Sequence, residues 1–371
     1  MTSSSMQDAG LPAEPARPVT VVVVASTNVR LERLKHLLAT VGIEVVAGVR
    51  TVDEGVDAVS EHEPDTVLLD LAMPTGGLEL VERIMGRRAT PIVLTGAAAE
   101  GAAMAMAAGA VDLVTPGTEG LGPVVYARAL ARHLSVASRV RVITHPRGRL
   151  RERGLATGTA SDGSPTRQRP PSQGRSHRPS VVVIGASTGG PPALAVILAA
   201  LPAELDVPVV VVQHMAEGFV EGLASWLDGL VARPVSVALN GDRLRRGHIV
   251  LAPSDGNLVV EPGLRLSIED PRPGQFHVPE IDRTLQSVAE VCRDRAVGVL
   301  LTGMGRDGAA GMLALRRVGA YTIGQDEGTS AVWGMPAAAA ALGGLDVELP
   351  LPEIAAALTD AVRRLQIHEA V

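Results

Sequence analysis

Short runs of β-branched residues alternate with amphipathic segments along most of this chain. The first run, VTVVVVAS at 19–26, precedes the helical segment VRLERLKHLLATVG, and further apolar runs follow as IEVVAGV, TVLLDLAMP, PIVLTGA and VDLVTPG. Continuous apolar strands that alternate with helices form parallel sheets covered by helices on both faces. The pattern therefore predicts a doubly wound α/β fold, in which ligands bind at the carboxyl ends of the strands.

The same alternation begins again near residue 180, with the apolar runs SVVVIGAS, VPVVVVQHM, AVGVLLTGMG and AYTIGQD. We therefore expect two doubly wound domains. Between the second and third of these runs lie HIVLAP at 248–253 and NLVVEP at 257–262, separated by an Asp-Gly step. Because Asp-Gly is a turn signal, these two runs predict a β-hairpin inserted into the second domain.

A basic segment separates the two domains. Residues 136–179 contain ten arginines and two acidic residues and are rich in Gly, Ser and Pro, which is typical of a solvated linker. A basic tether could instead lie across an acidic domain or recruit an acidic partner. We divide the chain into a Pro- and Ser-rich tail at 1–17, a first domain at 18–135, the linker at 136–179 and a second domain at 180–371.

The composition excludes several classes of function. With two residues each of Phe, Tyr and Trp, the chain lacks the rows of aromatic faces that bind nucleic acid by base stacking. The lone cysteine, Cys292, cannot form an internal disulfide and fits a reducing compartment. No apolar run reaches the roughly 18–20 residues of a membrane helix. We expect a soluble, cytoplasmic protein that is not inserted into a membrane.

The first candidate catalytic residue of the second domain lies where its first strand meets the following helix. The strand SVVVIG leads into GASTGG at 185–190, which satisfies G-x-S-x-G and places Ser187 at a sharp turn before Pro191. The free N–H groups of the helix that follows can stabilise an oxyanion. Similar Gly-rich turns cradle phosphate groups, so this loop alone leaves a hydrolase and an anion-binding site open.

Two further strand ends favour nucleophilic catalysis. VPVVVVQ ends at His214, and the turn after AVGVLLTGMG carries Asp307. Carboxyl ends of parallel strands share one edge of the sheet, so a base and a carboxylate are expected beside Ser187. His277 is the rival base. Asp282 and Asp326 are rival acids, and Asp307 could instead cap its helix.

The segments GASTGG, QHM, TGMGRDG and QDEGTSAVWGMP resemble, in this order, the protein-glutamate methylesterases of bacterial chemotaxis, the CheB family. The resemblance implies a flavodoxin-like receiver domain followed by a Rossmann-like methylesterase domain. It implies hydrolysis of glutamyl methyl esters on chemoreceptors, with release of methanol through a glutamyl-enzyme, and deamidation of receptor glutamines. Ser187 would be the nucleophile, His214 the base and Asp307 its orienter. The Met304 N–H would lie in the oxyanion hole, with Thr188 beside the nucleophile.

The resemblance requires no metal or organic cofactor. It implies a methylated chemoreceptor or similar signalling protein as partner, together with a histidine kinase, and no nucleic acid. Two departures from the family pattern lie near the expected site. Glu280 stands where the family has Ser, and Asn257 follows a turn where the family has His. We expect both to affect substrate docking.

In the first domain, PDTVLLDLAMP places Asp70 at the end of a strand, as in the phosphoacceptor segment of response-regulator receivers, and Thr95 matches their switch hydroxyl. Receivers have two acidic Mg²⁺ ligands after the first strand, whereas this chain has Ala25 and Ser26. Thr115 replaces the usual lysine. Phosphoryl transfer depends on cations that neutralise charge, so we expect a degenerate receiver with a poor acceptor at Asp70.

Three alternatives stay open from the sequence. Ser26 and Asn28 could support residual metal binding in the first domain. The second domain could keep its fold as a regulatory or scaffolding protein of a two-component pathway with reduced catalysis. GASTGG could also serve an anion- or nucleotide-binding module, whose ligand affinity would survive Ser187→Ala.

Overall fold

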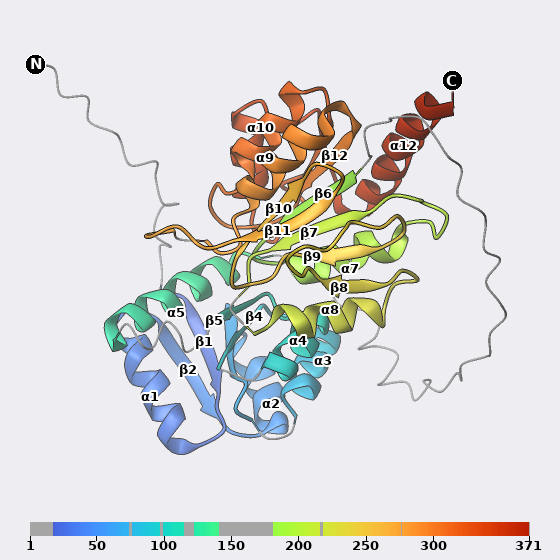
Figure 1. Cartoon of the computed structure of the whole chain (residues 1–371). Coiled ribbons are helices and arrows are strands. Elements are labelled where there is room, and N and C mark those ends of the chain that lie inside the picture. Colours follow the sequence, from blue (N-terminus) through green and yellow to red (C-terminus); the bar gives the residue numbers. More distant parts are fainter. Residues whose placement is uncertain are drawn as a thin grey trace, which may run out of the picture.

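The structure is a computed structural model that describes residues 18–73, 76–96, 99–114, 122–140, 181–215, 218–275 and 277–370. It contains two α/β domains, each built on a parallel sheet with helices on both faces (Figure 1). The predicted fold class, two doubly wound domains, is confirmed. The predicted tail at 1–17 and nearly all of the predicted linker lie outside the described residues.

The first domain contains one five-stranded sheet with the order β2-β1-β3-β4-β5, in which every pairing is parallel. This is the flavodoxin-like order of doubly wound sheets. Its elements are β1 (Thr20–Val24), α1 (Asn28–Ala39), β2 (Glu44–Val49), α2 (Val52–His62), β3 (Thr66–Asp70), α3 (Gly77–Arg87), β4 (Ile92–Thr95), α4 (Ala99–Ala107), β5 (Asp112–Val114) and α5 (Pro123–Ala137).

The second domain contains a seven-stranded parallel sheet with the order β14-β13-β12-β6-β7-β9-β8. Its first half comprises β6 (Val181–Ala186), α7 (Gly190–Ala200), β7 (Val209–Gln213), α8 (Val220–Asp228), β8 (Val235–Val237), β9 (Ile249–Leu251), β10 (Asn257–Glu261) and β11 (Arg265–Glu269). Its second half comprises α9 (Ile281–Cys292), η2 (Arg293–Arg295), β12 (Ala296–Leu300), α10 (Ala309–Arg317), β13 (Tyr321–Gln325), α11 (Met335–Ala341), β14 (Val347–Leu349) and α12 (Leu351–Ala370).

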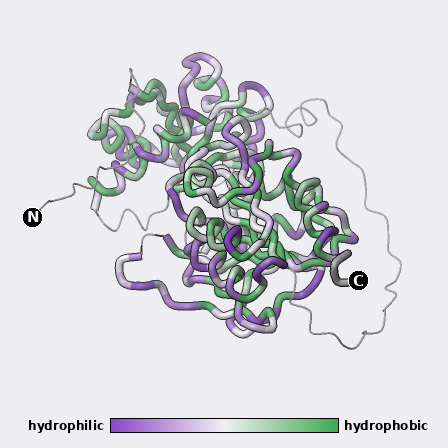
Figure 2. The backbone as a smooth tube through the Cα atoms, turned by 90° about the horizontal axis from the view of Figure 1, so that it is seen from above, coloured by the Kyte–Doolittle hydropathy of each residue, from purple (hydrophilic) through white to green (hydrophobic). Residues whose placement is uncertain are grey.

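The central strands are buried on both faces, as their unbroken apolar sequences require. Every residue of β3, β6, β7 and β12 is buried. Val182, Ile184 and Val211 point into one core layer of the second domain, and Val183 and Val210 point into the other. Hydrophilic stretches lie mainly along outer loops (Figure 2). The rigid sheet thereby fixes where the functional strand ends lie.

The structure corrects the predicted hairpin. The run HIVLAP forms β9, which pairs in parallel with β7 and β8 inside the main sheet. The antiparallel hairpin is instead β10–β11, and its turn contains Gly263 and Leu264 with φ of 77° and 57°. A short apolar run does not reveal whether its neighbour is parallel or antiparallel, and the Asp-Gly step lies in the connection rather than in the hairpin turn.

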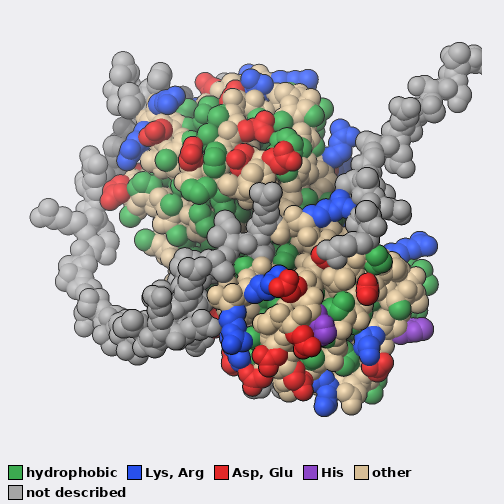
Figure 3. Space-filling view, turned by 180° about the vertical axis from the view of Figure 1, so that it is seen from behind, with side chains coloured by type: hydrophobic (Ala, Val, Ile, Leu, Met, Phe, Trp, Pro, Cys, Tyr) green, Lys and Arg blue, Asp and Glu red, His purple; other side chains and the backbone are tan. Residues whose placement is uncertain are grey.

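Helix α5 ends at Ala137, two residues inside the range that we assigned to the linker. On the face drawn in Figure 3, acidic and basic side chains are interspersed over both domains rather than separated by sign. Within the described ranges, no helix is both long and apolar enough to cross a membrane.

Candidate active site

Ser187 follows β6 directly and precedes the first turn of α7. Gly189 adopts the left-handed conformation, with φ of 75°, and Pro191 occupies the first turn of the helix. At Gly190, an added Cβ would lie 1.9 Å from Gln213 Oε1, so glycine is required for the close approach of the helix to β7. The sequence thus forms the sharp turn that was predicted from GASTGG.

His214 follows β7, the strand adjacent to β6. The His214 N–H donates to the Ala186 carbonyl at 3.0 Å. The buried Gln213 amide donates to the carbonyls of both Ser187, at 2.9 Å, and His214, at 2.8 Å. This one amide links the two strand ends. Gln213 was not predicted from the sequence as a site residue, although its place before His214 in a buried strand was the available signal.

Ser187 and His214 line the same cavity, which has a volume of about 370 Å³. Across the part of the chain that the structure describes, the Ser187 hydroxyl makes no hydrogen bond. His214 Nε2 lies 2.7 Å from Asp307 Oδ2. Nδ1 is therefore the ring nitrogen left to receive a proton from a nucleophile.

Asp307 lies in the loop after β12 and is held by backbone groups as well as by His214. Its Oδ2 accepts from the Ile281 N–H at 2.8 Å, and its Oδ1 accepts from the N–H groups of Asp282, at 2.8 Å, and Gly308, at 2.9 Å. The N-terminus of α9 thus points at this carboxylate, which suits an anion.

Burial is the largest influence on Asp307 and raises its pKa. The hydrogen bond and charge of His214, together with the Asp282 and Ile281 N–H groups, outweigh burial and hold the pKa of Asp307 below its ordinary value. The carboxylate therefore stays ionised, as a group that stabilises an imidazolium must.

Two of the three rival residues, His277 and Asp282, lie beside the site, and all three make other contacts. The His277 ring stacks on His214, with centroids 4.6 Å apart and planes 6° from parallel. Burial and the neighbouring His214 lower the pKa of His277. Asp282 accepts from the Gly311 N–H at 2.6 Å, and burial raises its pKa to about 6. Asp326 accepts from Thr329 in its own turn. Among the described acids, Asp307 is the one bonded to His214.

The expected oxyanion region is tightly packed against Ser187. A Cβ at Gly303 would lie 2.7 Å from the Ser187 Cβ and 2.2 Å from the Met335 sulfur, so residue 303 must be glycine. Met304 follows it and lines the cavity. The turn that carries Met304 thus lies beside Ser187, and the role of the Met304 N–H in an oxyanion hole stays a prediction.

The first domain covers the cavity. The Gly189 N–H donates to the Val111 carbonyl at 3.1 Å, and the Thr188 hydroxyl donates to Asp112 Oδ2 at 3.1 Å. His133 Nδ1 lies 2.8 Å from the same carboxylate oxygen. The first domain lines the cavity with Met106, Asp112, Leu113, Arg132 and His133; the second does so with Ser187, Thr188, Gln213, His214, Met215, His277, Val278 and Met304. Both domains thus form the site.

The interface extends beyond the cavity. Phe219 of the second domain is 4% exposed and packs into an apolar cluster of the first domain that includes Met106. Arg132 Nε lies 3.3 Å from the Met304 sulfur and brings a cation to the predicted oxyanion turn. No pattern in the sequence indicated which surface of the first domain packs here.

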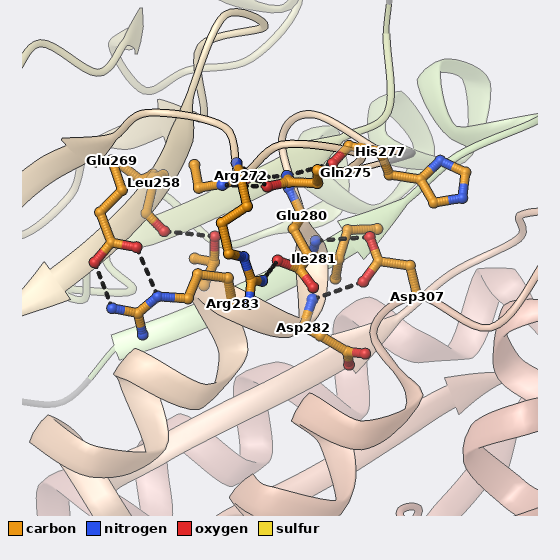
Figure 4. A network of polar contacts seen from close by, with 12 residues as sticks. Leu258, Glu269, Arg272, Gln275, His277, Glu280, Ile281, Asp282, Arg283 and Asp307 are labelled. Atoms are coloured by element: carbon orange, nitrogen blue, oxygen red, sulfur yellow. Dashed lines mark hydrogen bonds and ion pairs between the residues drawn. The ribbon is translucent and has the colours of Figure 1, made fainter.

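The two departures from the family pattern belong to one polar network, part of which is drawn in Figure 4. Glu280 pairs with Arg272, and the buried Asn257 is hydrogen-bonded to Gln275. Neither Glu280 nor Asn257 lines the cavity. The expectation that both alter substrate docking stays a prediction, and their contacts show a structural use for each.

Asp70 is fully buried at the end of β3, and polar groups surround it. Its Oδ2 accepts from the Ser26 hydroxyl at 2.9 Å, and its Oδ1 accepts from the Ala72 N–H at 3.1 Å. Arg30 Nε lies 3.0 Å from Oδ1 in an ion pair, with the Arg30 side chain 23% exposed. Arg30 was missed from the sequence, although it lies one helical turn after Ser26.

The other positions predicted for a receiver site are Thr95, Thr115 and the pair Ala25 and Ser26. The Thr95 hydroxyl lies 2.5 Å from the Tyr126 hydroxyl of α5, in a buried contact. Thr115 lies outside the described residues. No group of three or more His, Cys, Asp or Glu side chains suited to a metal ion is found among the residues described. Ala25 and Ser26 occupy the places of the acidic pair, as the sequence indicates.

Comparison with known proteins assigns both domains to families. Residues 182–358 match the CheB methylesterase family, and residues 21–116 match the response regulator receiver domain. "Protein-glutamate methylesterase/protein-glutamine glutaminase 3" of Paramagnetospirillum magneticum is 38% identical over 93% of this chain and 97% of its own length. "Protein-glutamate methylesterase/protein-glutamine glutaminase 2" of Anaeromyxobacter dehalogenans is 40% identical over 94% of this chain and 98% of its own length.

Among solved structures, the catalytic domain of Thermotoga maritima CheB methylesterase is 34% identical, with a TM-score of 0.48, and the match covers 49% of this chain and 98% of that one. The two curated relatives match in sequence across both domains. The resemblance noted in the motifs is thereby confirmed, and the chain belongs to the CheB methylesterase family, with a receiver domain ahead of its methylesterase domain.

Proposed function

We propose that this protein is a protein-glutamate methylesterase that hydrolyses glutamyl methyl esters on a chemoreceptor or similar signalling protein. The observation that carries the proposal is the 2.7 Å contact of Asp307 with His214, whose side chain lines the same cavity as Ser187. Base and carboxylate have the mutual geometry of a catalytic relay. Membership in a family of methylesterases supplies the reaction class.

In the proposed mechanism, Ser187 Oγ attacks the ester carbonyl carbon while His214 Nδ1 takes the hydroxyl proton. The carbonyl electrons move to an oxyanion near the Met304 N–H, and Asp307 stabilises the imidazolium. The C–O bond to the methoxy group then breaks, and the His214 proton leaves with it as methanol. Water repeats the sequence on the glutamyl-enzyme, which releases the glutamate carboxylate and restores Ser187.

The same relay supports deamidation of a receptor glutamine, with ammonia as the leaving group in place of methanol. The relatives carry the name glutaminase as well as methylesterase. Both reactions pass through the same glutamyl-enzyme, so both require Ser187. A variant that lost one activity and kept the other would indicate a substrate effect outside the relay.

The receiver domain must move before a receptor helix reaches Ser187. It binds the Thr188 hydroxyl and the Gly189 N–H and contributes Arg132 and His133 to the cavity wall. A glutamyl side chain attached to a folded receptor cannot enter a site that another domain covers. We therefore propose that separation of the two domains precedes each encounter with substrate.

Methanol release from a methylated receptor tests the proposal, with wild type compared against Ser187→Ala. The expected result is turnover by wild type and its loss in Ser187→Ala, because the nucleophile is gone while His214 and Asp307 keep their contact. Equal methanol release by both proteins would refute the esterase assignment. Absence of turnover in wild type, with intact binding to the receptor, would favour the scaffolding alternative.

A further inference from the structure

The segment between β11 and α9 carries two parts of the proposed relay. It presents the His277 ring that stacks on His214, and it ends at the α9 N-terminus, whose Ile281 and Asp282 N–H groups hold Asp307. Its described residues, 270–275 and 277–280, lie in neither a helix nor a strand. Its position therefore depends on side-chain contacts with the rest of the domain.

Asn257, at the start of β10, supplies those contacts. Asn257 is 2% exposed. Asn257 Oδ1 accepts from the Glu280 N–H at 2.8 Å and from Gln275 Nε2 at 2.8 Å, and its Nδ2 donates to Gln275 Oε1 at 3.1 Å. Gln275 extends the network, because its Nε2 also donates to the His277 carbonyl at 2.6 Å and its Oε1 accepts from the Arg272 N–H at 3.0 Å. The amide thus fixes the segment on both sides of His277.

The neighbouring ion pairs are weaker candidates for this role. Arg272 and Glu280 pair at the surface, with the Arg272 side chain 69% exposed. Arg283 contacts Glu269 through two hydrogen bonds, at 2.8 and 2.6 Å, and Figure 4 shows this pair on the far side of the α9 N-terminus from His277. Exposed ion pairs contribute little, whereas a buried amide whose hydrogen bonds are lost leaves unsatisfied groups behind.

We propose that Asn257 is a positioning residue for the relay, acting through Gln275 and the Glu280 backbone on His277 and on the N–H groups that hold Asp307. This inference rests on the proposed esterase function. It assigns a use to one residue at which the chain departs from its family: Asn257 and Gln275 form a reciprocal amide pair that a histidine at 257 could not make. Asn257 touches neither Ser187 nor the cavity, so it is not a catalytic residue.

The experiment compares Asn257→Leu, which removes every polar contact at similar volume, with Asn257→Asp, which keeps the oxygen that accepts from Glu280. Arg283→Gln is the matched control on the first turn of α9. Two readouts are needed: kcat and KM for methanol release, and the imidazole NMR signals of His214 and His277, which respond to ring stacking without turnover. Thermal unfolding shows whether each variant is folded.

Asn257→Leu is expected to lower kcat by roughly 10- to 100-fold, because small misplacements of catalytic groups are costly. KM should change much less, and the His214 and His277 signals should lose their stacking shift. Asn257→Asp should lie between Leu and wild type, and Arg283→Gln should match wild type. A folded Asn257→Leu with unchanged histidine signals would overturn the proposal. If wild type releases no methanol, the proposed function fails, while the NMR comparison still decides the positioning role.

A separate observation concerns the receiver. The family implies a divalent cation beside Asp70, and the residues present do not fit one. Ala25 and Ser26 offer no carboxylate, and Asp70 already accepts from Ser26 and Ala72 and pairs with Arg30 at 3.0 Å. A carboxylate with no exposed surface needs a counter-charge, and the Arg30 guanidinium supplies one.

We infer that Arg30 neutralises Asp70 permanently in place of a divalent cation, and that the receiver covers the active site whether or not a phosphodonor is present. Phosphoryl transfer needs the acceptor carboxylate exposed and its charge balanced by a metal ion. Here the attacking oxygens are engaged by protein groups. The histidine kinase that the receiver family implies would therefore not act through Asp70.

The full chain is incubated with radiolabelled acetyl phosphate and millimolar Mg²⁺, with Asp70→Asn as the matched variant. Equal background labelling of the two proteins, and methanol release by wild type that the phosphodonor does not change, are expected. A second arm measures unfolding: Arg30→Met should lower the receiver Tm by about 10 °C, and adding Asp70→Asn should recover much of that loss. Stoichiometric labelling of wild type that Asp70→Asn abolishes, or an unchanged Tm in Arg30→Met, would overturn the inference.

Discussion

The contact between Asp112 and Thr188 is one of the bonds that hold the receiver over the active site, and Asp112→Ala tests how much it contributes. Asp112 is 15% exposed on its side chain and is the acceptor for Thr188 at 3.1 Å and for His133 at 2.8 Å. The His133 contact lies within the receiver and survives domain separation. The Thr188 contact crosses the interface, and it is lost when the domains part.

The expected change in the free energy of domain docking is the contribution of the one hydrogen bond between Thr188 and Asp112. A hydrogen bond to a charged group contributes about 1.5–3 kcal/mol. Because 1.4 kcal/mol corresponds to a factor of ten, Asp112→Ala should raise the ratio of separated to docked domains by roughly 10- to 100-fold. The remaining contacts, including Phe219 in the receiver core, keep the docked state populated. Turnover should rise by up to the same factor where domain separation limits access to Ser187.

Two assays measure this prediction. Methanol release from a methylated receptor gives kcat/KM, and hydrogen exchange at Gly189, whose N–H donates to the Val111 carbonyl, reports domain separation directly. Faster exchange at Gly189 with faster turnover is the expected outcome. Asp53→Ala, which removes an exposed receiver carboxylate paired with Arg83 and away from the cavity, is the control. Faster exchange without faster turnover would refute the argument that the receiver limits access.

Three further predictions concern the relay and its surroundings. Asp307→Asn should lower kcat by about 10⁴-fold, because the amide no longer holds and stabilises the His214 imidazolium; a loss below tenfold would contradict the assigned role. Gly303→Ala should destabilise the protein by about 1–3 kcal/mol and slow turnover, since its Cβ would overlap Met335 and Ser187; unfolding and kcat measured together check both effects. Burial raises the pKa of Asp282 from 3.8 to about 6, so the folded state favours the protonated carboxyl group. The contribution of Asp282 to the free energy of unfolding is therefore higher at low pH and falls as the pH rises from 3.8 to about 6. Asp282→Asn should therefore increase stability above pH 6, by about 1–2 kcal/mol after allowance for partial exposure, and unfolding curves at pH 5 and pH 8 would detect it.

The sequence was sufficient to predict the two parallel sheets, since buried parallel strands require unbroken apolar runs that a reader can recognise. It was also sufficient to predict that Ser187, His214 and Asp307 lie at one edge of the sheet, because the carboxyl ends of parallel strands share that edge. It was not sufficient to separate a parallel strand from a hairpin strand at β9, where both arrangements bury the same apolar run.

Contacts between distant polar side chains could not be predicted in the same way. Asn257 and Gln275 are 18 residues apart, and nothing in their local pattern marks them as partners. The docking of Asp112 on Thr188 depends on how two finished domains pack. Arg30 could have been predicted from the sequence. This receiver lacks both the acidic pair that would bind a metal ion and the usual lysine, and a buried Asp70 still needs a cation nearby. The first helix offers one at the position one turn after Ser26.

Asp70 and Asp307 illustrate how a partner decides what a buried aspartate can do. Both lie at or just after the carboxyl end of a parallel strand, and both accept backbone N–H groups. Asp307 faces an imidazole, a group that can accept a proton at one ring nitrogen and donate from the other, so its charge can support a reaction that moves protons. Asp70 faces a guanidinium, which does not release its proton, so its charge is balanced in every state of the protein. A buried aspartate on the carboxyl side of a parallel sheet is thus suited to proton transfer beside an imidazole and to fixed structure beside a guanidinium.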